Sequence, residues 1–223
     1  MVGYDRLFKV VASLVAGAAV LVGAREAKAA GDGWGLHSGE TMSRGSLMPY
    51  GEVGWPDVSL GVAYGISDKI DIGGRLGFVY GPYHSPAFVG FGMALSVPVR
   101  FSLVKGGSIS ALIHVDPGLR FPLFSPVLFG IQFPVGAEVG IHVAEHATLQ
   151  VGLDVPMHVN FLRGAYFSIA PMAGPGFEYH IGSLALGLNT RFGATILAGG
   201  GGGASFSGAG FGFLTQAYVG YKL

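Results

Sequence analysis

The feature that most constrains the fold of this chain is an alternation of bulky apolar and small residues that runs from Val58 to the C-terminus. In residues 58–66, Val, Leu, Val, Tyr and Ile occupy every second position, and Ser, Gly, Ala and Gly fill the positions between them. Successive side chains of a β-strand point to opposite faces, so a period of two residues indicates strands. The pattern restarts after Asp68 and continues in later segments, which predicts an all-β protein.

Ten candidate strands follow one another along the chain. We expect them at residues 46–54, 57–66, 69–80, 89–104, 108–121, 127–143, 148–161, 166–180, 183–197 and 210–223. Tight connections fall at 67–68, 105–107, 144–147 and 181–182, and looser ones at 81–88, 122–126, 162–165 and 198–209. Short turns at one end and longer loops at the other are typical of membrane β-barrels. The sequence therefore predicts an antiparallel up-and-down transmembrane β-barrel of about ten strands, with roughly 8–12 compatible with the pattern and both termini periplasmic.

The chemistry of the two strand faces indicates which one faces lipid. One face carries residues such as Phe91, Met93 and Leu95, whereas the other carries Gly92 and Ala94 with a few charged groups. Charged residues make up 12% of the 223 residues, and there are 40 glycines. A soluble domain usually has about a quarter of its residues charged. We therefore expect the bulky face to contact lipid and the small face to line a narrow lumen.

The N-terminal 45 residues carry a different signal. Arg6 and Lys9 precede a 15-residue apolar stretch, residues 10–24, and Ala27-Lys28-Ala29 forms a small-x-small cleavage pattern. A spanning helix needs about 20 residues, so residues 1–29 are interpreted as a cleaved signal peptide. Residues 30–45 lack periodicity, and we expect a flexible periplasmic leader there, followed by the barrel over 46–223.

The end of the last strand supports this interpretation. Val219, Tyr221 and Leu223 lie on its bulky face and resemble the C-terminal signal by which outer-membrane barrels are recognised for assembly, with Leu in place of the usual Phe or Trp. Over nearly all of its mature length the chain resembles the small porin-like outer-membrane β-barrel proteins of Gram-negative bacteria. This resemblance implies a location in the cell outer membrane. It also implies two partners, the outer-membrane lipids and the barrel assembly machinery.

The small face contains equal numbers of acidic and basic residues, which we expect to form a charge network in the lumen. Its members are Arg75, Arg100, Asp116, Arg120, Glu138, Asp154, Glu178 and Arg191. A charge in a narrow barrel needs a partner to offset its desolvation. Glu138 and Asp154 are expected to lie roughly opposite one another, with Arg75, Arg100 or Arg191 between them. The network either fills the interior or forms a polar lining that admits water and small solutes.

Prolines inside the predicted strands conflict with regular pairing, because proline removes a hydrogen bond from the ladder. They are Pro98, Pro117, Pro134, Pro156, Pro171 and Pro175. Each is expected to mark either a bulge or a point where pairing ends. A bulge would also exchange the inner and outer faces beyond it.

Other motifs give weaker indications of chemistry. His142 and His146 have a metal-like spacing, but that spacing aligns ligands on a helix, not across a strand end. Ser85 beside His84 lies in a loop with no assignable acid, and Gly199–Gly203 lacks the Lys-Ser/Thr of a phosphate loop and is interpreted as a flexible external loop. We therefore expect no catalytic, cofactor or metal site. The formal net charge of zero and the absence of a basic run give no basis for nucleic-acid binding.

Three functions remain open. The first is a narrow porin-like channel for ions or small solutes. The second is a non-conducting structural or surface-interaction barrel with an ion-paired lumen. The third, a lipid-modifying outer-membrane enzyme, would need a Ser/His/acid set near the external rim, and none is evident, so we expect no enzyme.

Overall fold

The computed structural model describes residues 33–81, 91–123, 129–161, 165–201 and 204–223. The predicted signal peptide lies outside this part of the chain, as do His84 and Ser85. No helix of the described residues is long and apolar enough to cross a membrane.

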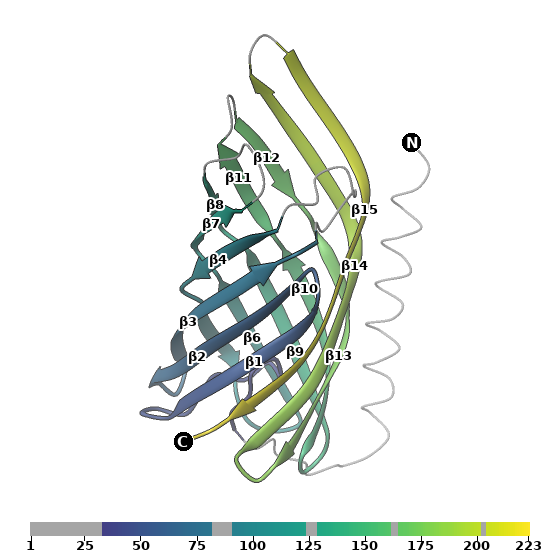
Figure 1. Cartoon of the computed structure of the whole chain (residues 1–223). Coiled ribbons are helices and arrows are strands. Elements are labelled where there is room, and N and C mark those ends of the chain that lie inside the picture. Colours follow the sequence, from purple (N-terminus) through teal and green to yellow (C-terminus); the bar gives the residue numbers. More distant parts are fainter. Residues whose placement is uncertain (1–32, 82–90, 124–128, 162–164, 202–203) are drawn as a thin grey trace, which may run out of the picture.

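The described chain forms one antiparallel sheet of 15 strands (Figure 1), which confirms the all-β antiparallel prediction. The strands are β1 (Leu47–Trp55), β2 (Asp57–Ser67), β3 (Ile70–Val79), β4 (Gly92–Ser96), β5 (Val99–Val104), β6 (Ile109–Val115), β7 (Gly118–Pro122), β8 (Phe129–Gln132), β9 (Val135–Ala144), β10 (Ala147–Val155), β11 (Met157–Phe161), β12 (Ala165–Ile169), β13 (Met172–Ile181), β14 (Leu184–Gly201) and β15 (Ala204–Tyr221). The count exceeds the ten strands expected, because five of the predicted strands are each divided into two.

Pairing connects these strands in two rings that share β1, β2, β3, β14 and β15. One ring continues from β3 through β4, β7, β8, β11 and β12 and returns to β14. The other continues from β3 through β5, β6, β9, β10 and β13, and also returns to β14. Each ring therefore contains ten strands, and Figure 1 shows them wrapped around a common interior.

The two rings meet along a row of prolines. Each division of a predicted strand falls at one of them, namely Pro98, Pro117, Pro134, Pro156 and Pro171. The carbonyls of these prolines still accept inter-strand bonds, as in Gly73 N–H to Pro98 O (2.8 Å) and Asp116 N–H to Pro134 O (2.9 Å). The row thus marks where regular pairing ends on one strand after another. Pro175 differs, since it lies within β13 and pairs with Val151.

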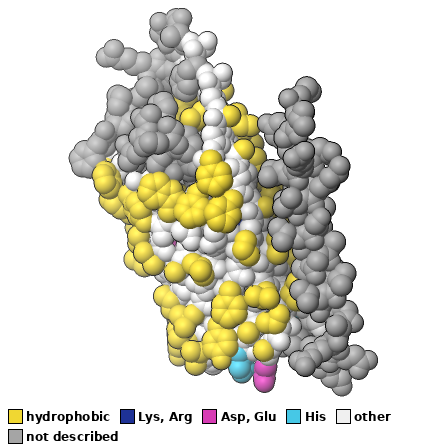
Figure 2. All heavy atoms as spheres, turned by 90° about the vertical axis from the view of Figure 1, so that its right-hand side faces the viewer, with side chains coloured by type: hydrophobic (Ala, Val, Ile, Leu, Met, Phe, Trp, Pro, Cys, Tyr) yellow, Lys and Arg dark blue, Asp and Glu magenta, His cyan; other side chains and the backbone are white. Residues whose placement is uncertain are grey.

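The prolines do not exchange the two faces. In β4 and β5, Leu95 and Phe101 are exposed on the outer side, whereas Ser96 and Arg100, on either side of Pro98, are both buried on the inner side. The apolar residues predicted to face lipid form the outer surface, for example Leu60 at 68% and Leu153 at 49% exposure. In Figure 2 apolar side chains spread over the described part of the viewed face.

Two predicted irregular segments are regular or buried in the structure. The loop expected at 198–209 is wrong for most of its length, because β14 extends to Gly201 and β15 begins at Ala204, and the two pair along a long hairpin. Small residues fit an extended ladder as well as a loop, so composition alone did not separate the two.

The flexible leader expected at 30–45 is also corrected for its described residues, 33–45. Trp34, Leu36 and Met42 are almost fully buried and pack against inner-face residues of the strands. These three apolar side chains lose contact with water by packing against the inner faces of the strands. Their burial stabilises a segment whose sequence has no periodicity. We call residues 33–45 the inner segment.

Candidate functional site

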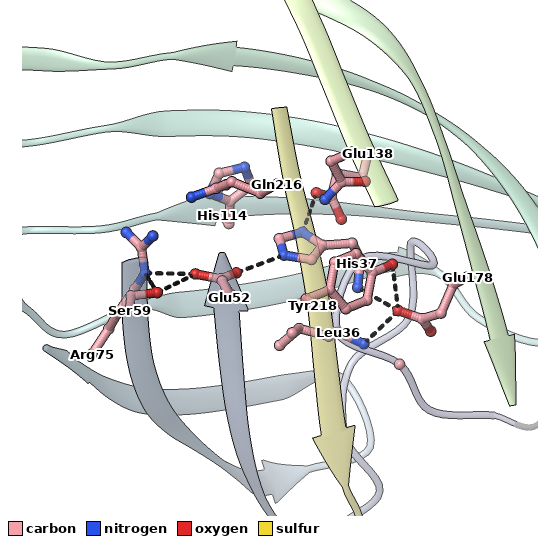
Figure 3. A network of polar contacts seen from close by, with 12 residues as sticks. Leu36, His37, Glu52, Ser59, Arg75, His114, Glu138, Glu178, Gln216 and Tyr218 are labelled. Atoms are coloured by element: carbon pink, nitrogen blue, oxygen red, sulfur yellow. Dashed lines mark hydrogen bonds and ion pairs between the residues drawn. The ribbon is translucent and has the colours of Figure 1, made fainter. Parts of the chain in front are cut away.

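The inner segment is held by a histidine that lies between two glutamates from different strands. His37 Nδ1 is 2.9 Å from Glu138 Oε1 of β9, and His37 Nε2 is 3.1 Å from Glu52 Oε1 of β1 (Figure 3). Burial alone would lower the pKa of His37, but the charge of Glu138 and the hydrogen bonds to Glu138 and Glu52 raise it to about 10. At neutral pH the imidazolium therefore donates to both carboxylates, and it fixes the inner segment to two walls.

The backbone of the inner segment is bound on both sides. Leu36 N–H and His37 N–H donate to Glu178 Oε2 at 3.1 and 2.9 Å, and the hydroxyl of Tyr218 donates to the same oxygen at 3.0 Å. Arg100 Nη1 donates to Gly35 O at 2.9 Å and also to Leu36 O. The Glu178 carboxylate and the Arg100 guanidinium thus form the hydrogen bonds that a neighbouring strand would otherwise make to this backbone.

The two ends of the inner segment have further contacts. The Trp34 ring stacks on His180 with centroids 4.3 Å apart, and Lys222 Nζ lies 4.6 Å from the Trp34 ring. A cation near an indole face is attracted by its quadrupole. At the other end, Met42 N–H donates to Asp71 Oδ2 at 2.8 Å. The inner segment is therefore anchored along its whole described length.

The arginines of the predicted network each contact specific groups. Arg75 lies 2.8 Å from Glu52 Oε2 and 3.0 Å from Asp57 Oδ1. Arg100 Nη2 lies 2.7 Å from Asp71 Oδ2. Both arginines thus pair with acids that the sequence interpretation did not include.

Glu138 and Asp154 are offset by two positions in the register, since Glu138 lies opposite Gly152 and Asp154 lies opposite Gly136. Arg191 is the arginine between them, with Nε 2.9 Å from Asp154 Oδ2 and Nη2 3.9 Å from Glu138 Oε1. It is 1% exposed, so this pairing takes place away from bulk water.

The remaining predicted members are placed differently. Glu178 contacts His180 at 2.8 Å in addition to the inner segment. Arg120 Nη1 lies 3.2 Å from His158 Nδ1, so this arginine contacts a histidine. Asp116 lines the interior cavity, and its Oδ1 is buried with no hydrogen-bond partner among the described residues.

Several interior charges were missed from the sequence. Asp57 and Asp71 lie on the small faces of their strands, and this alternation could have identified both. Glu52 shares the inner face of β1 with the bulky Met48 and Tyr50, so the alternation does not mark it. His37 and Glu40 belong to the inner segment, where no period exists to place them. Their interior position became visible only with the packing of the inner segment.

Glycines on the inner face provide the space in which the long polar side chains cross. A Cβ at Gly136 would lie 2.1 Å from His114 Nε2, and a Cβ at Gly152 would lie 2.2 Å from Arg191 Nη2. His114 passes over Gly136 to reach Asp154 Oδ1 at 3.1 Å. The abundance of glycine in the strands therefore has a direct role in forming the ion pairs.

A cavity of about 110 Å³ remains beside the inner segment. Leu36 and His37 line it on one side. Gly73 of β3 and two residues of the proline row, Pro98 and Pro134, also line it. Its wall carries the carboxylates of Glu52, Asp71, Asp116, Glu138 and Asp154 and the bases Arg75, Arg100 and His114. A volume of this size with polar partners is sufficient for ordered water or a small ion.

A second polar cluster in the interior contains a hydroxyl, an imidazole and a carboxylate, from Thr148, His142 and Glu40. His142 Nδ1 is 2.8 Å from Thr148 Oγ1, and His142 Nε2 is 3.6 Å from Glu40 Oε1. All three residues are buried, which leaves no access for a substrate to the Thr148 hydroxyl in this conformation. Across the described residues, no group of three or more His, Cys, Asp or Glu side chains is arranged to hold a metal ion.

No protein-family model matches the sequence, and the comparison with curated proteins finds no match. Among solved structures, the N-terminal β-barrel domain of Pseudomonas aeruginosa OprF is similar, with a TM-score of 0.41 and 10% identity over 82% of this chain and 100% of that domain. At this identity and TM-score the likeness assigns no function to this chain.

Proposed function

We propose that this chain is an integral outer-membrane β-barrel, a narrow porin-like channel for ions or small solutes that the inner segment closes in the described conformation. The observation that carries this proposal is the separation of the two faces. The outer face is apolar around the rings, with exposed residues such as Leu60, Leu153 and Phe211, and the inner face holds buried charges. In water such an outer face would leave a large apolar area exposed, which is unfavourable. In a lipid bilayer the same area contacts acyl chains, as in transmembrane β-barrels.

The height of the apolar surface supports the membrane proposal. Tyr221 and Phe211 both point outward from β15 and lie ten residues apart. At about 3.4 Å per residue and a tilt of roughly 40°, this separation is about 26 Å along the barrel axis, close to the ~25 Å apolar band of outer-membrane barrels. Aromatic residues at both limits suit the two membrane interfaces.

Membrane crossing by strands supports the outer membrane as the location, and the C-terminal strand with its outward Val219, Tyr221 and Leu223 supports recognition by the barrel assembly machinery. Outer-membrane lipids would then contact the apolar outer face. We propose no catalytic activity, because Thr148, His142 and Glu40 are buried together.

Conduction in this proposal requires that the inner segment move. Its removal would leave the cavity and the polar inner face in contact with water from one end. The second candidate, a non-conducting barrel, is favoured by the density of ion pairs, since Glu52, Glu138 and Glu178 all bind the inner segment.

Single-channel recording of the refolded protein in planar bilayers tests the proposal. We expect the wild type to be mostly closed. Deletion of residues 33–45 should produce stable openings, and Trp34→Ala, which removes one anchor and leaves the strand ion pairs intact, should produce brief ones. Val53→Ala on the outer face of β1 is the matched control and should behave as wild type. If folded samples of both inner-segment variants stay closed, the non-conducting barrel replaces the channel.

A further inference from the structure

The barrel holds the inner segment through its main chain, as a binding site holds a peptide. Two consecutive N–H groups, of Leu36 and His37, donate to Glu178 Oε2 (Figure 3). Two consecutive carbonyls, of Gly35 and Leu36, accept from Arg100 Nη1. Main-chain bonds of this kind give affinity for a peptide whatever its side chains are, and pockets for the side chains then give specificity.

The two side chains that bind this main chain are fixed by the strands and not by the inner segment. Arg100 donates from Nε and Nη2 to the carboxylate of Asp71 on β3, at 2.8 and 2.7 Å, which leaves Nη1 for the peptide carbonyls. Glu178 Oε1 lies 2.8 Å from His180 Nε2, and Glu178 Oε2 accepts from the Tyr218 hydroxyl at 3.0 Å. Both groups are therefore preorganised, and the site persists when the inner segment leaves it.

The strands also provide separate positions for the side chains of the segment. The Trp34 ring stacks on His180 with centroids 4.3 Å apart, and Lys222 Nζ lies 4.6 Å from the Trp34 ring. Three positions further along, the His37 imidazolium lies between two glutamates of the strands. The site therefore selects an aromatic residue that is followed, three positions later, by a cationic one.

The two positions between these side chains have different requirements. A Cβ at Gly35 would lie 1.8 Å from Ser38 Oγ and 2.4 Å from Glu178 Oε1. Rotation of Ser38 can relieve the first contact, but Glu178 is held by its strand partners. Beside Leu36 and His37, in contrast, the cavity of about 110 Å³ leaves room for larger side chains. The pattern that the interior recognises is thus aromatic, glycine, apolar, cationic.

We propose that this part of the interior is a binding site for short peptides with the pattern aromatic-glycine-apolar-cationic, which the inner segment occupies in cis. The inference names a solute class for the proposed channel. It rests on that proposed function for the role of such peptides as solutes, whereas binding itself does not require conduction. A tethered segment competes at a high effective concentration, so a free peptide binds measurably once the segment is weakened.

Fluorescence anisotropy of a labelled peptide tests this site in the full chain. The probe is a free peptide with the sequence of residues 33–45 and fluorescein at its C-terminal end. The protein is Trp34→Ala in detergent, whose own inner segment has lost its stacked ring. We expect saturable binding, about tenfold tighter than to the wild type, in which the intact segment holds the site. Val53→Ala, on the outer face of β1, is the matched control and should bind the probe as weakly as the wild type.

Competition by four tetrapeptides, each acetylated and amidated, defines what is recognised. Trp-Gly-Leu-Lys should displace the probe, because its lysine takes the place of the imidazolium between the two glutamates. Trp-Ala-Leu-Lys should fail because its Cβ meets Glu178, and Trp-Gly-Leu-Glu should fail because it adds a third carboxylate. Trp-Gly-Leu-Lys that is N-methylated at leucine lacks one N–H donor to Glu178, and it should compete about tenfold less well.

If Trp34→Ala does not fold, the Trp55→Phe chain provides the test. Trp34 is then the only tryptophan of the 223 residues. Its ring is buried, so displacement of the inner segment by Phe-Gly-Leu-Lys should shift its emission to the red. Phe-Gly-Leu-Glu is the matched control and should leave the emission unchanged.

The outcomes separate the peptide site from the channel. Absence of binding to folded Trp34→Ala, or equal competition by all four tetrapeptides, would overturn the peptide site even in a barrel that conducts. Selective binding in a barrel that never conducts would uphold the site and refute the channel.

Discussion

Arg191 reaches Asp154 by crossing directly over Gly152, and its Nε lies 2.9 Å from Asp154 Oδ2. A side chain at Gly152 would begin 2.2 Å from Arg191 Nη2. The buried guanidinium and the glycine beneath it therefore form one unit. The face alternation alone would class Gly152→Ser as a mild change on the small face, and the structure contradicts that expectation.

Gly152→Ser should destabilise the protein, because Arg191 must leave Asp154 and the guanidinium remains buried without its carboxylate. Separating a buried pair costs roughly 3 kcal/mol. Urea unfolding titrations in lipid vesicles measure the change. Gly74→Ser is the control, since a Cβ at Gly74 meets nothing within 4 Å. Equal midpoints for the two variants would show that Arg191 does not cross Gly152.

Leu153→Arg examines the neighbouring outer position. Leu153 is exposed on β10, and an arginine there should cost about 2–4 kcal/mol if the residue lies near the bilayer midplane. The same urea titration is the measurement, with Leu153→Ala as the control for lost apolar area. An arginine variant as stable as the alanine variant would place Leu153 outside the bilayer.

The stability of the protein should depend on pH through His37. Its pKa rises from 6.5 to about 10 in the folded state, so its contribution is complete below pH 6.5 and is lost as the pH rises toward 10. Urea midpoints of the wild type should therefore fall across this window. His37→Gln removes the titrating group, and its difference from wild type should shrink as the pH increases. A difference that stays constant with pH would mean that His37 is neutral in the fold.

Alternation predicted the strands and their faces because the two-residue period continues across each proline, so that inner residues before and after a break lie an even number of positions apart. Ser96 and Arg100 lie on the same side across Pro98, so the period continues through the interruption. The inner segment was not predictable in this way. Leu36 and Glu178 are 142 residues apart, and no local pattern in 33–45 indicates where such a partner lies. The sequence also does not show that Arg191, rather than Arg75 or Arg100, lies between Glu138 and Asp154. That arrangement depends on the stagger of the strands, which determines which side chains meet across the interior, and a two-residue period does not specify the stagger.

Thiol labelling of intact cells tests the orientation of the barrel. Lys69 lies at the turn between β2 and β3, at the end where the chain terminates, and Gly208 lies near the far end of β15. A cysteine at Gly208 should react with an impermeant maleimide, because the long β14–β15 hairpin faces outward from the cell in the proposed topology. A cysteine at Lys69 should react only after the outer membrane is permeabilised. Both positions are exposed, so accessibility to the reagent depends on the side of the membrane and not on burial. Labelling of the Lys69 site alone on intact cells would reverse the topology, and equal labelling of both sites would show that the chain does not span the membrane.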